Sequence, residues 1–142
     1  MRRLLLAWFP TLAYMAAIVV MSNRPPILES TAGSWFFPGM DKLAHAAEYG
    51  LLVLFLRRSL RLSGSSRPGR DALVATALFG VSDELHQGLL PYRSCELGDW
   101  LADVAGAAGT LWVWGKLRER EEGIRRIVAG GDDPVCEASR GQ

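Results

Sequence analysis

Nearly half of the 142 residues are apolar, and the net charge is only +1. The length suffices for one domain of ordinary size. No long basic run with interleaved aromatic residues occurs, which argues against nucleic acid as a partner. The two cysteines, Cys95 and Cys136, do not have the spacing of a metal-binding pair.

The first apolar segment, residues 4–21, has no charged residue in 18 positions. This length predicts a membrane-spanning helix. A cleaved signal peptide is the alternative, because Arg2 and Arg3 precede the segment. We disfavour the signal peptide because the apolar stretch is long for a signal core, because "VVMSNRPP" is a poor cleavage site, and because more apolar segments follow.

Three further apolar segments occupy residues 43–56, 71–90 and 100–115. The first of these contains His45 and Glu48, the second is polar at its end, and the third contains Asp103. A charged residue at the centre of a membrane helix costs about 2.5–3.5 kcal/mol. We therefore expect these helices to hide their charges against each other or to place them near one membrane face.

The lysines and arginines indicate an orientation. If four helices span the membrane alternately, thirteen of the sixteen basic residues fall on the side of the two termini, and only Arg24, Lys42 and Arg93 fall on the other side. This asymmetry is the positive-inside pattern. We therefore expect an all-α, integral membrane bundle of four transmembrane helices with both ends in the cytoplasm. Residues 1–115 would form the transmembrane domain, and residues 116–142 a charged cytoplasmic tail that continues the fourth helix before losing order.

Acidic residues gather on the outer side of this predicted bundle. Eight of the fifteen lie there, namely Glu29, Asp41, Glu48, Asp83, Glu84, Glu96, Asp99 and Asp103. The outer side then has a net charge of −5 and the inner side +6. The positive-inside rule does not require this gathering of acids, so it is a separate observation.

Polar residues recur at helical spacing near the outer ends of three predicted helices. They are Asp41, His45, Glu48 and Tyr49 in the second segment, Asp83 and Gln87 in the third with Glu84 and His86 flanking them, and Asp99, Asp103 and Gly106 in the fourth. Residues three, four, seven or eight positions apart share one helix face. We expect these faces to meet in an acidic pocket that opens to the outer leaflet, with Lys42 and Arg93 at its rim.

Several of these residues have a structural alternative. Asp41 and Asp99 could be helix N-caps. Glu84 could face an outer loop, Tyr49 could anchor its helix at the interface, and His86 could face lipid headgroups. These alternatives remain open at the level of sequence.

Four residues lie deeper, and we expect them to form an acid–base or catalytic core: His45, Glu48, Asp83 and Asp103. Ionisable residues within a membrane span are functional candidates, and carboxylates beside a histidine suit proton transfer. A packed network that holds short helices together would need the same residues. Oxygen ligands with histidine could also hold a divalent cation, but the spacing matches no metal signature, so we predict no metal.

The remaining candidates would bind a ligand around this core. They are Asp41, Lys42, Tyr49, Glu84, Gln87, Arg93 and Asp99. Lys42 and Arg93 could hold a lipid phosphate at the headgroup level, or they could pair with the neighbouring acids. The sequence identifies no cofactor and leaves open whether the protein is an enzyme.

Three ordered motifs, "DKLAHAAEYGLL", "SDELHQGLLPYR" and "DWLADVAGAAG", lie within about residues 41–110. Together they resemble the VanZ-like family of small bacterial membrane proteins, which is named after a protein linked to teicoplanin resistance. The resemblance implies a multi-pass protein of the bacterial cytoplasmic membrane in a cell-envelope context. One departure is Asp103, where the family usually has asparagine. The difference matters because asparagine can donate a hydrogen bond and an ionised aspartate cannot.

Two functions fit these observations. In the first, the protein binds or modifies a lipid or lipid-linked cell-wall component at the outward-facing pocket and so affects glycopeptide sensitivity. In the second, it is a non-enzymatic subunit of a larger envelope transporter or glycan-assembly complex, and the polar residues only hold its helices together.

Overall fold

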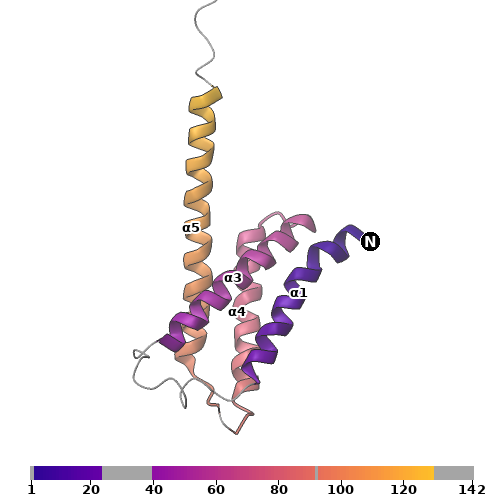
Figure 1. The fold of residues 1–142 in the computed structure, drawn as a ribbon, viewed down its shortest axis with the longest axis vertical. Coiled ribbons are helices and arrows are strands. Elements are labelled where there is room, and N and C mark those ends of the chain that lie inside the picture. The colour runs from indigo at the N-terminus through magenta and orange to yellow at the C-terminus, as the bar shows by residue number, and fades with distance from the viewer. Residues whose placement is uncertain (1, 24–39, 92, 130–142) are drawn as a thin grey trace, which may run out of the picture. The chain divides into compact units, whose positions relative to one another are not determined.

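The computed structural model describes residues 2–23, 40–91 and 93–129, and this part of the chain is helical with no strand. Figure 1 shows the four helices α1 (Arg2–Ser22), α3 (Met40–Leu62), α4 (Pro68–Gln87) and α5 (Leu97–Ala129). The prediction of an all-α chain with four helices is thereby confirmed for these residues. Arg24, Glu29 and Cys136 lie outside the described residues.

The chain divides into two compact units. The first is Met1–Leu111 and the second is Trp112–Gln142, so α5 contributes to both. All the candidate site residues belong to the first unit, and the description of the site therefore concerns this unit alone.

The apolar composition of α1 distinguishes it from the other helices. Residues Leu4–Ser22 have a mean hydropathy of 2.1, and among the described residues this is the one helix that is long and apolar enough to cross a membrane. Charged residues within α3, α4 and α5 lower their hydropathy, as the sequence had indicated.

The connection between α3 and α4 is short. Gly64 has a φ of 89°, a left-handed conformation that glycine adopts without a steric cost. Pro68 then occupies the beginning of α4, where its missing N–H would have no helical partner in any case. These two residues turn the chain so that α4 packs along α3.

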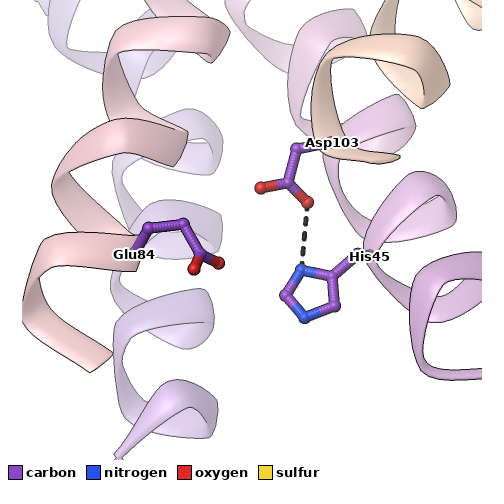
Figure 2. A group of neighbouring side chains, drawn as sticks. All are labelled: His45, Glu84 and Asp103. Carbon is purple, nitrogen blue, oxygen red and sulfur yellow. Dashed lines mark hydrogen bonds and ion pairs between the residues drawn. The ribbon is translucent and has the colours of Figure 1, made fainter. Parts of the chain in front are cut away.

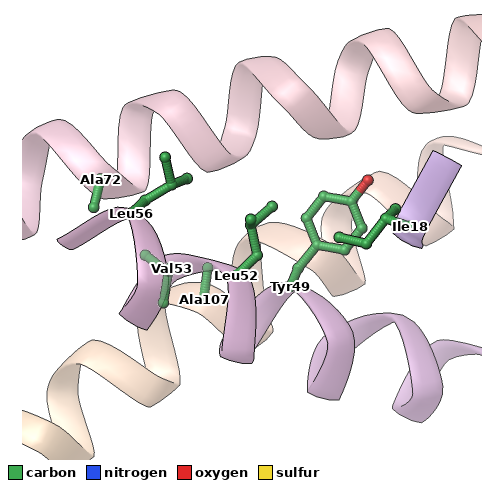
Figure 3. Close-up of a cluster of buried hydrophobic side chains, with 7 residues drawn as sticks. All are labelled: Ile18, Tyr49, Leu52, Val53, Leu56, Ala72 and Ala107. Atoms are coloured by element: carbon green, nitrogen blue, oxygen red, sulfur yellow. The ribbon is translucent and has the colours of Figure 1, made fainter. Parts of the chain in front are cut away.

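The apolar core lies around α3, which packs against both α1 and α4. Figure 3 shows its members, Ile18, Tyr49, Leu52, Val53, Leu56, Ala72 and Ala107. In the N-terminal half of α1, the hydroxyls of Thr11 and Ser59 lie 2.7 Å apart, and Ser59 donates to the Ala7 carbonyl at 2.8 Å. Buried hydroxyls thus join α1 to α3 where the apolar core ends.

Small residues bring α3 and α5 close together. A Cβ atom on Gly106 would overlap the backbone of Ala46, and a Cβ atom on Gly50 would lie 2.6 Å from the Thr110 Oγ1 atom. Glycine at these positions lets two helix backbones approach more closely than any larger residue permits. This approach sets the distance between the polar side chains that α3 and α5 carry.

Candidate functional site

The polar candidates gather at one end of the first unit, where α1 and α4 end and where α3 and α5 begin (Figure 1). Two long-range hydrogen bonds locate this end: Ser22 donates to Asp83, and Lys42 donates to Asp99. We call this region the polar end of the bundle.

Asp83 joins three helices. Its buried Oδ2 atom accepts hydrogen bonds from Ser22 Oγ at 3.0 Å, from Tyr49 OH at 3.2 Å and from Gln87 Nε2 at 3.0 Å. The donors come from α1, α3 and α4 respectively. Three donors on one oxygen stabilise a buried carboxylate and fix its orientation.

A second contact joins α3 to α5. The imidazole Nδ1 atom of His45 lies 3.0 Å from the Asp103 Oδ1 atom, as Figure 2 shows. In the Nδ1–H tautomer the imidazole donates this hydrogen bond. The other ring nitrogen, Nε2, lies 3.9 Å from Asp99 Oδ2. His45 therefore lies between two carboxylates of α5, which is the composition of a general acid–base pair.

Glu84 is buried, with 4% of its surface exposed, so it does not extend into an outer loop. Its Oε2 atom accepts a hydrogen bond from the backbone N–H of Glu96 at 2.9 Å. Its Oε1 atom and the Oδ2 atom of Asp103 are both buried without a hydrogen-bond partner among the described residues. Such unsatisfied oxygens are costly, and they are uncommon in folded proteins.

Lys42 lies among three carboxylates at the edge of the polar end. Its Nζ atom is 2.8 Å from Asp99 Oδ1, 3.4 Å from Asp41 Oδ2 and 3.7 Å from Glu96 Oε2. The hydrogen bond to Asp99 is the main cause of a raised pKa for Lys42, and the backbone N–H of Lys42 is the main cause of a lowered pKa for Asp41. Of the two roles the sequence allowed for Lys42, this geometry favours pairing with the acids over holding a phosphate.

The structure also gives the positions of three other acidic candidates, Asp41, Asp99 and Glu48, which their spacing in the sequence did not specify. Asp41 and Asp99 lie in the first turns of α3 and α5, just inside the helices. Glu48 is half-buried, and its carboxylate makes no hydrogen bond to the described residues, although its backbone carbonyl accepts one from Tyr14 at 3.2 Å. Glu48 is therefore less tightly connected to the polar end than the sequence indicated.

Arg93 follows α4 and is partly buried. Its Nε atom is buried and has no hydrogen-bond partner among the described residues. A guanidinium N–H without a partner can donate to a ligand oxygen, so Arg93 has a donor that no described residue occupies, whereas the Lys42 ammonium is already paired with Asp99.

A family comparison decides the assignment. The model of the VanZ/LLP1 family matches residues 4–117 of the chain. The chain belongs to the VanZ/LLP1 family. None of the curated proteins and none of the solved structures matches the chain.

This VanZ-like chain places its three motifs together at the polar end. The first motif supplies His45 and Tyr49, the second Asp83 and Glu84, and the third Asp103. At the position where the VanZ-like pattern usually has asparagine, the Asp103 side chain still contacts His45 at 3.0 Å. An asparagine oxygen could accept the same hydrogen bond, so the contact itself does not require the aspartate.

Sequence reasoning missed two residues of the polar end. Ser22 donates to Asp83 from the last residue of α1, and Trp100 donates from Nε1 to the Ala77 carbonyl at 3.0 Å. Ser22 is the first polar residue after the apolar run of residues 12–21, which is the signal that could have identified it. Trp100 had no such signal, because an indole N–H finds its acceptor only through helix packing.

A surface hollow of about 520 Å³ lies elsewhere in the first unit. Its lining residues are Arg70, Asp71, Val74, Ala75 and Leu78, near the beginning of α4. It shares no residue with the polar end.

Proposed function

We propose that this VanZ-like protein spans the bacterial cytoplasmic membrane with four helices and keeps both ends in the cytoplasm. The distribution of exposed and buried side chains supports this, because large apolar side chains are exposed and an acidic side chain is buried. Phe9 is 71% exposed and Leu78 66%, whereas Asp103 is 1% exposed. Large exposed apolar surface together with buried polar residues suits helices in lipid, and such a surface would be an aggregation hazard in water.

The basic residues support the orientation. The α3–α4 turn, which the positive-inside pattern assigns to the cytoplasm, is flanked by five described arginines: Arg57, Arg58, Arg61, Arg67 and Arg70. The polar end lies at the opposite ends of α3 and α4. In this orientation the polar end meets the outer leaflet of the membrane.

At the polar end the protein binds the anionic headgroup of a lipid or of a lipid-linked cell-wall component. The observation that carries this proposal is the buried Nε of Arg93, which has no partner among the described residues, close in the chain to the end of the bundle where His45, Asp83, Glu84 and Asp103 converge from three helices. The guanidinium would bind the phosphate, since arginine offers a fork of donors that matches phosphate oxygens. His45 and Asp103 could transfer a proton if the bound lipid is chemically changed.

Direct binding tests this proposal. The purified protein in lipid nanodiscs is titrated with a polyisoprenyl phosphate, and bound lipid is measured by native mass spectrometry. Arg93→Gln should weaken binding about ten- to hundredfold, because hydrogen bonds to charged groups contribute about 1.5–3 kcal/mol. Arg61→Gln is the matched control, because Arg61 is exposed in the last turn of α3 and should leave binding unchanged.

Equal binding by Arg93→Gln and the unaltered protein, in variants with the same thermal stability, would reject Arg93 as the phosphate ligand. In cells, the same pair of variants should separate in teicoplanin sensitivity. Arg93→Gln should behave like loss of the protein, and Arg61→Gln should behave like the unaltered protein.

A second function is favoured by the contacts of Asp83. Because this carboxylate accepts hydrogen bonds from α1, α3 and α4, part of the polar end serves to hold the helices together, as expected for a small non-enzymatic subunit of a larger envelope complex. Gentle detergent extraction and co-purification discriminate the two functions. A larger stoichiometric membrane partner supports the subunit, and a lone protein that binds the lipid phosphate excludes it.

A further inference from the structure

Three side chains from three helices face one another at the polar end. Each of His45, Glu84 and Asp103 offers a ligand atom, and these atoms all lie within 4.8 Å of one another. In Figure 2 the Glu84 carboxylate extends from α4 toward the space beside the His45 ring, and the Asp103 carboxylate reaches the ring from α5. The three groups therefore surround one small volume.

The oxygens in this volume lack hydrogen-bond donors. Glu84 Oε1 and Asp103 Oδ2 are buried without a partner among the described residues, in side chains that are 4% and 1% exposed. Lys42, the nearby described lysine, is held by Asp99 at 2.8 Å. Two buried carboxylates that face each other with free oxygens repel strongly when both are ionised, and a bound cation would relieve this repulsion.

The backbone of α4 approaches Asp103 closely at Gly80. Gly80 of α4 lies opposite this residue, and a Cβ atom there would come within 3.3 Å of Asp103 Oδ2. Glycine at this position therefore lets α4 pack directly against the unpartnered oxygen.

We propose that His45, Glu84 and Asp103 bind a divalent transition-metal cation, with Zn²⁺ as the best match. One imidazole nitrogen with two carboxylate oxygens suits Zn²⁺, whereas Mg²⁺ and Ca²⁺ prefer oxygen ligands alone. Ligand atoms around tetrahedral Zn²⁺ are about 3.4 Å apart, so the three groups would close by at most about 1.4 Å. Rotation of the flexible Glu84 side chain can supply most of this movement.

The surroundings of His45 fit a metal ligand. If Nδ1 binds the cation, Nε2 points toward Asp99, whose Oδ2 atom is 3.9 Å away. A carboxylate behind the second ring nitrogen is the usual arrangement for a metal-binding histidine, because it fixes the tautomer and the ring orientation. Three protein ligands leave a fourth position open, as in zinc sites that bind a water or a substrate.

The spacing along the chain could not reveal this site. The ligands lie 39 and 19 residues apart on three different helices, at positions 45, 84 and 103. Zinc signatures in sequences depend on ligands that are neighbours on one helix or in one loop. Cation binding here does not depend on lipid binding, so each can be tested without the other.

The experiment uses the full-length protein in detergent, stripped with a chelator and freed of the chelator by gel filtration. Titration with ZnCl₂ in a calorimeter should show one Zn²⁺ per chain, and MgCl₂ at the same concentrations should give no binding. Glu84→Gln and His45→Gln should each lower the Zn²⁺ affinity at least about a hundredfold, since even altered residues behind the ligands cost ten- to a hundredfold. Glu119→Gln makes the same chemical change at an exposed position on α5 and should bind as the unaltered protein does.

Cobalt provides a readout that does not require a variant to fold. Co²⁺ added to the unaltered protein should give the visible absorption of a four-coordinate site, and Zn²⁺ should displace it. Absence of stoichiometric Zn²⁺ binding, or equal affinity in the folded Glu84→Gln and unaltered proteins, would overturn the metal site. If Zn²⁺ binds while the polyisoprenyl phosphate does not, the metal site stands and the proposed lipid function fails; the opposite pair of results retains the lipid function alone.

Discussion

Replacement of Gly106 by alanine should separate α3 from α5. The added Cβ atom would overlap the Ala46 carbonyl oxygen and Cα atom. These are backbone atoms, so no side-chain rotation can relieve the overlap and one helix must move. Overpacking of this kind costs about 1–3 kcal/mol, and the better helix propensity of alanine offsets about 0.5–1 kcal/mol of it. The expected net loss of stability is therefore about 0–2.5 kcal/mol.

Gly109→Ala is the matched control on the same helix. A Cβ atom on Gly109 would have no atom within 4 Å, so this variant keeps the propensity gain of about 0.5–1 kcal/mol without the overlap. Thermal unfolding of both variants in the same detergent, followed by helical circular dichroism, should place Gly106→Ala several degrees below Gly109→Ala. Equal melting temperatures would refute the close contact between α3 and α5.

The same variant should also disturb the polar end. Ala46 follows His45 directly, and Gly106 lies three residues after Asp103. A shift that separates the two backbones therefore lengthens the 3.0 Å contact between His45 and Asp103. Gly106→Ala should lower the Zn²⁺ affinity, and Gly109→Ala should not.

Three further predictions concern topology and contacts. In intact cells that carry the Cys136→Ser variant, a membrane-impermeant maleimide should label the exposed Cys95. Labelling only after lysis would indicate the opposite orientation in the membrane. Tyr49→Phe should cost about 1 kcal/mol, because it removes the 3.2 Å hydrogen bond to the buried Asp83; an unchanged melting temperature would show that this bond contributes nothing. The pKa of Lys42 is raised in the folded protein. Any stability that the charged Lys42 contributes is therefore fully present below its unfolded pKa of about 10.4 and is lost as the pH rises through its folded pKa. Lys42→Gln should consequently change the melting temperature equally at pH 7 and pH 9.

The sequence predicted the helices well because apolar segments and basic loops are local signals. The continuation of the fourth helix into the charged region is an example, since α5 extends to Ala129. The same local signal placed His45 and Tyr49 on one face of their helix. It could not show that His45 contacts α5 whereas Tyr49 contacts Asp83 on α4, because that division depends on how the helices cross.

Burial was harder to predict than helical position. Glu84 follows Asp83 and lies about 100° around the helix, so an outward orientation was a reasonable alternative. It is buried because the chain returns over it after α4 and offers the Glu96 N–H to its carboxylate. Contacts of this kind join a helix to a connecting segment, and no periodicity in the sequence reports them.

The central claim is that an anionic lipid headgroup binds at the polar end of the bundle. The most direct measurement uses a polyisoprenyl phosphate with a photoreactive group near the phosphate, crosslinked to the protein in native membranes, with the attachment site located by mass spectrometry of peptides. The account predicts crosslinks concentrated in residues 83–103, which a large excess of unmodified lipid phosphate suppresses. Crosslinks spread evenly over the exposed apolar residues of α1 and α4, such as Phe9 and Leu78, and unaffected by the competitor would contradict it.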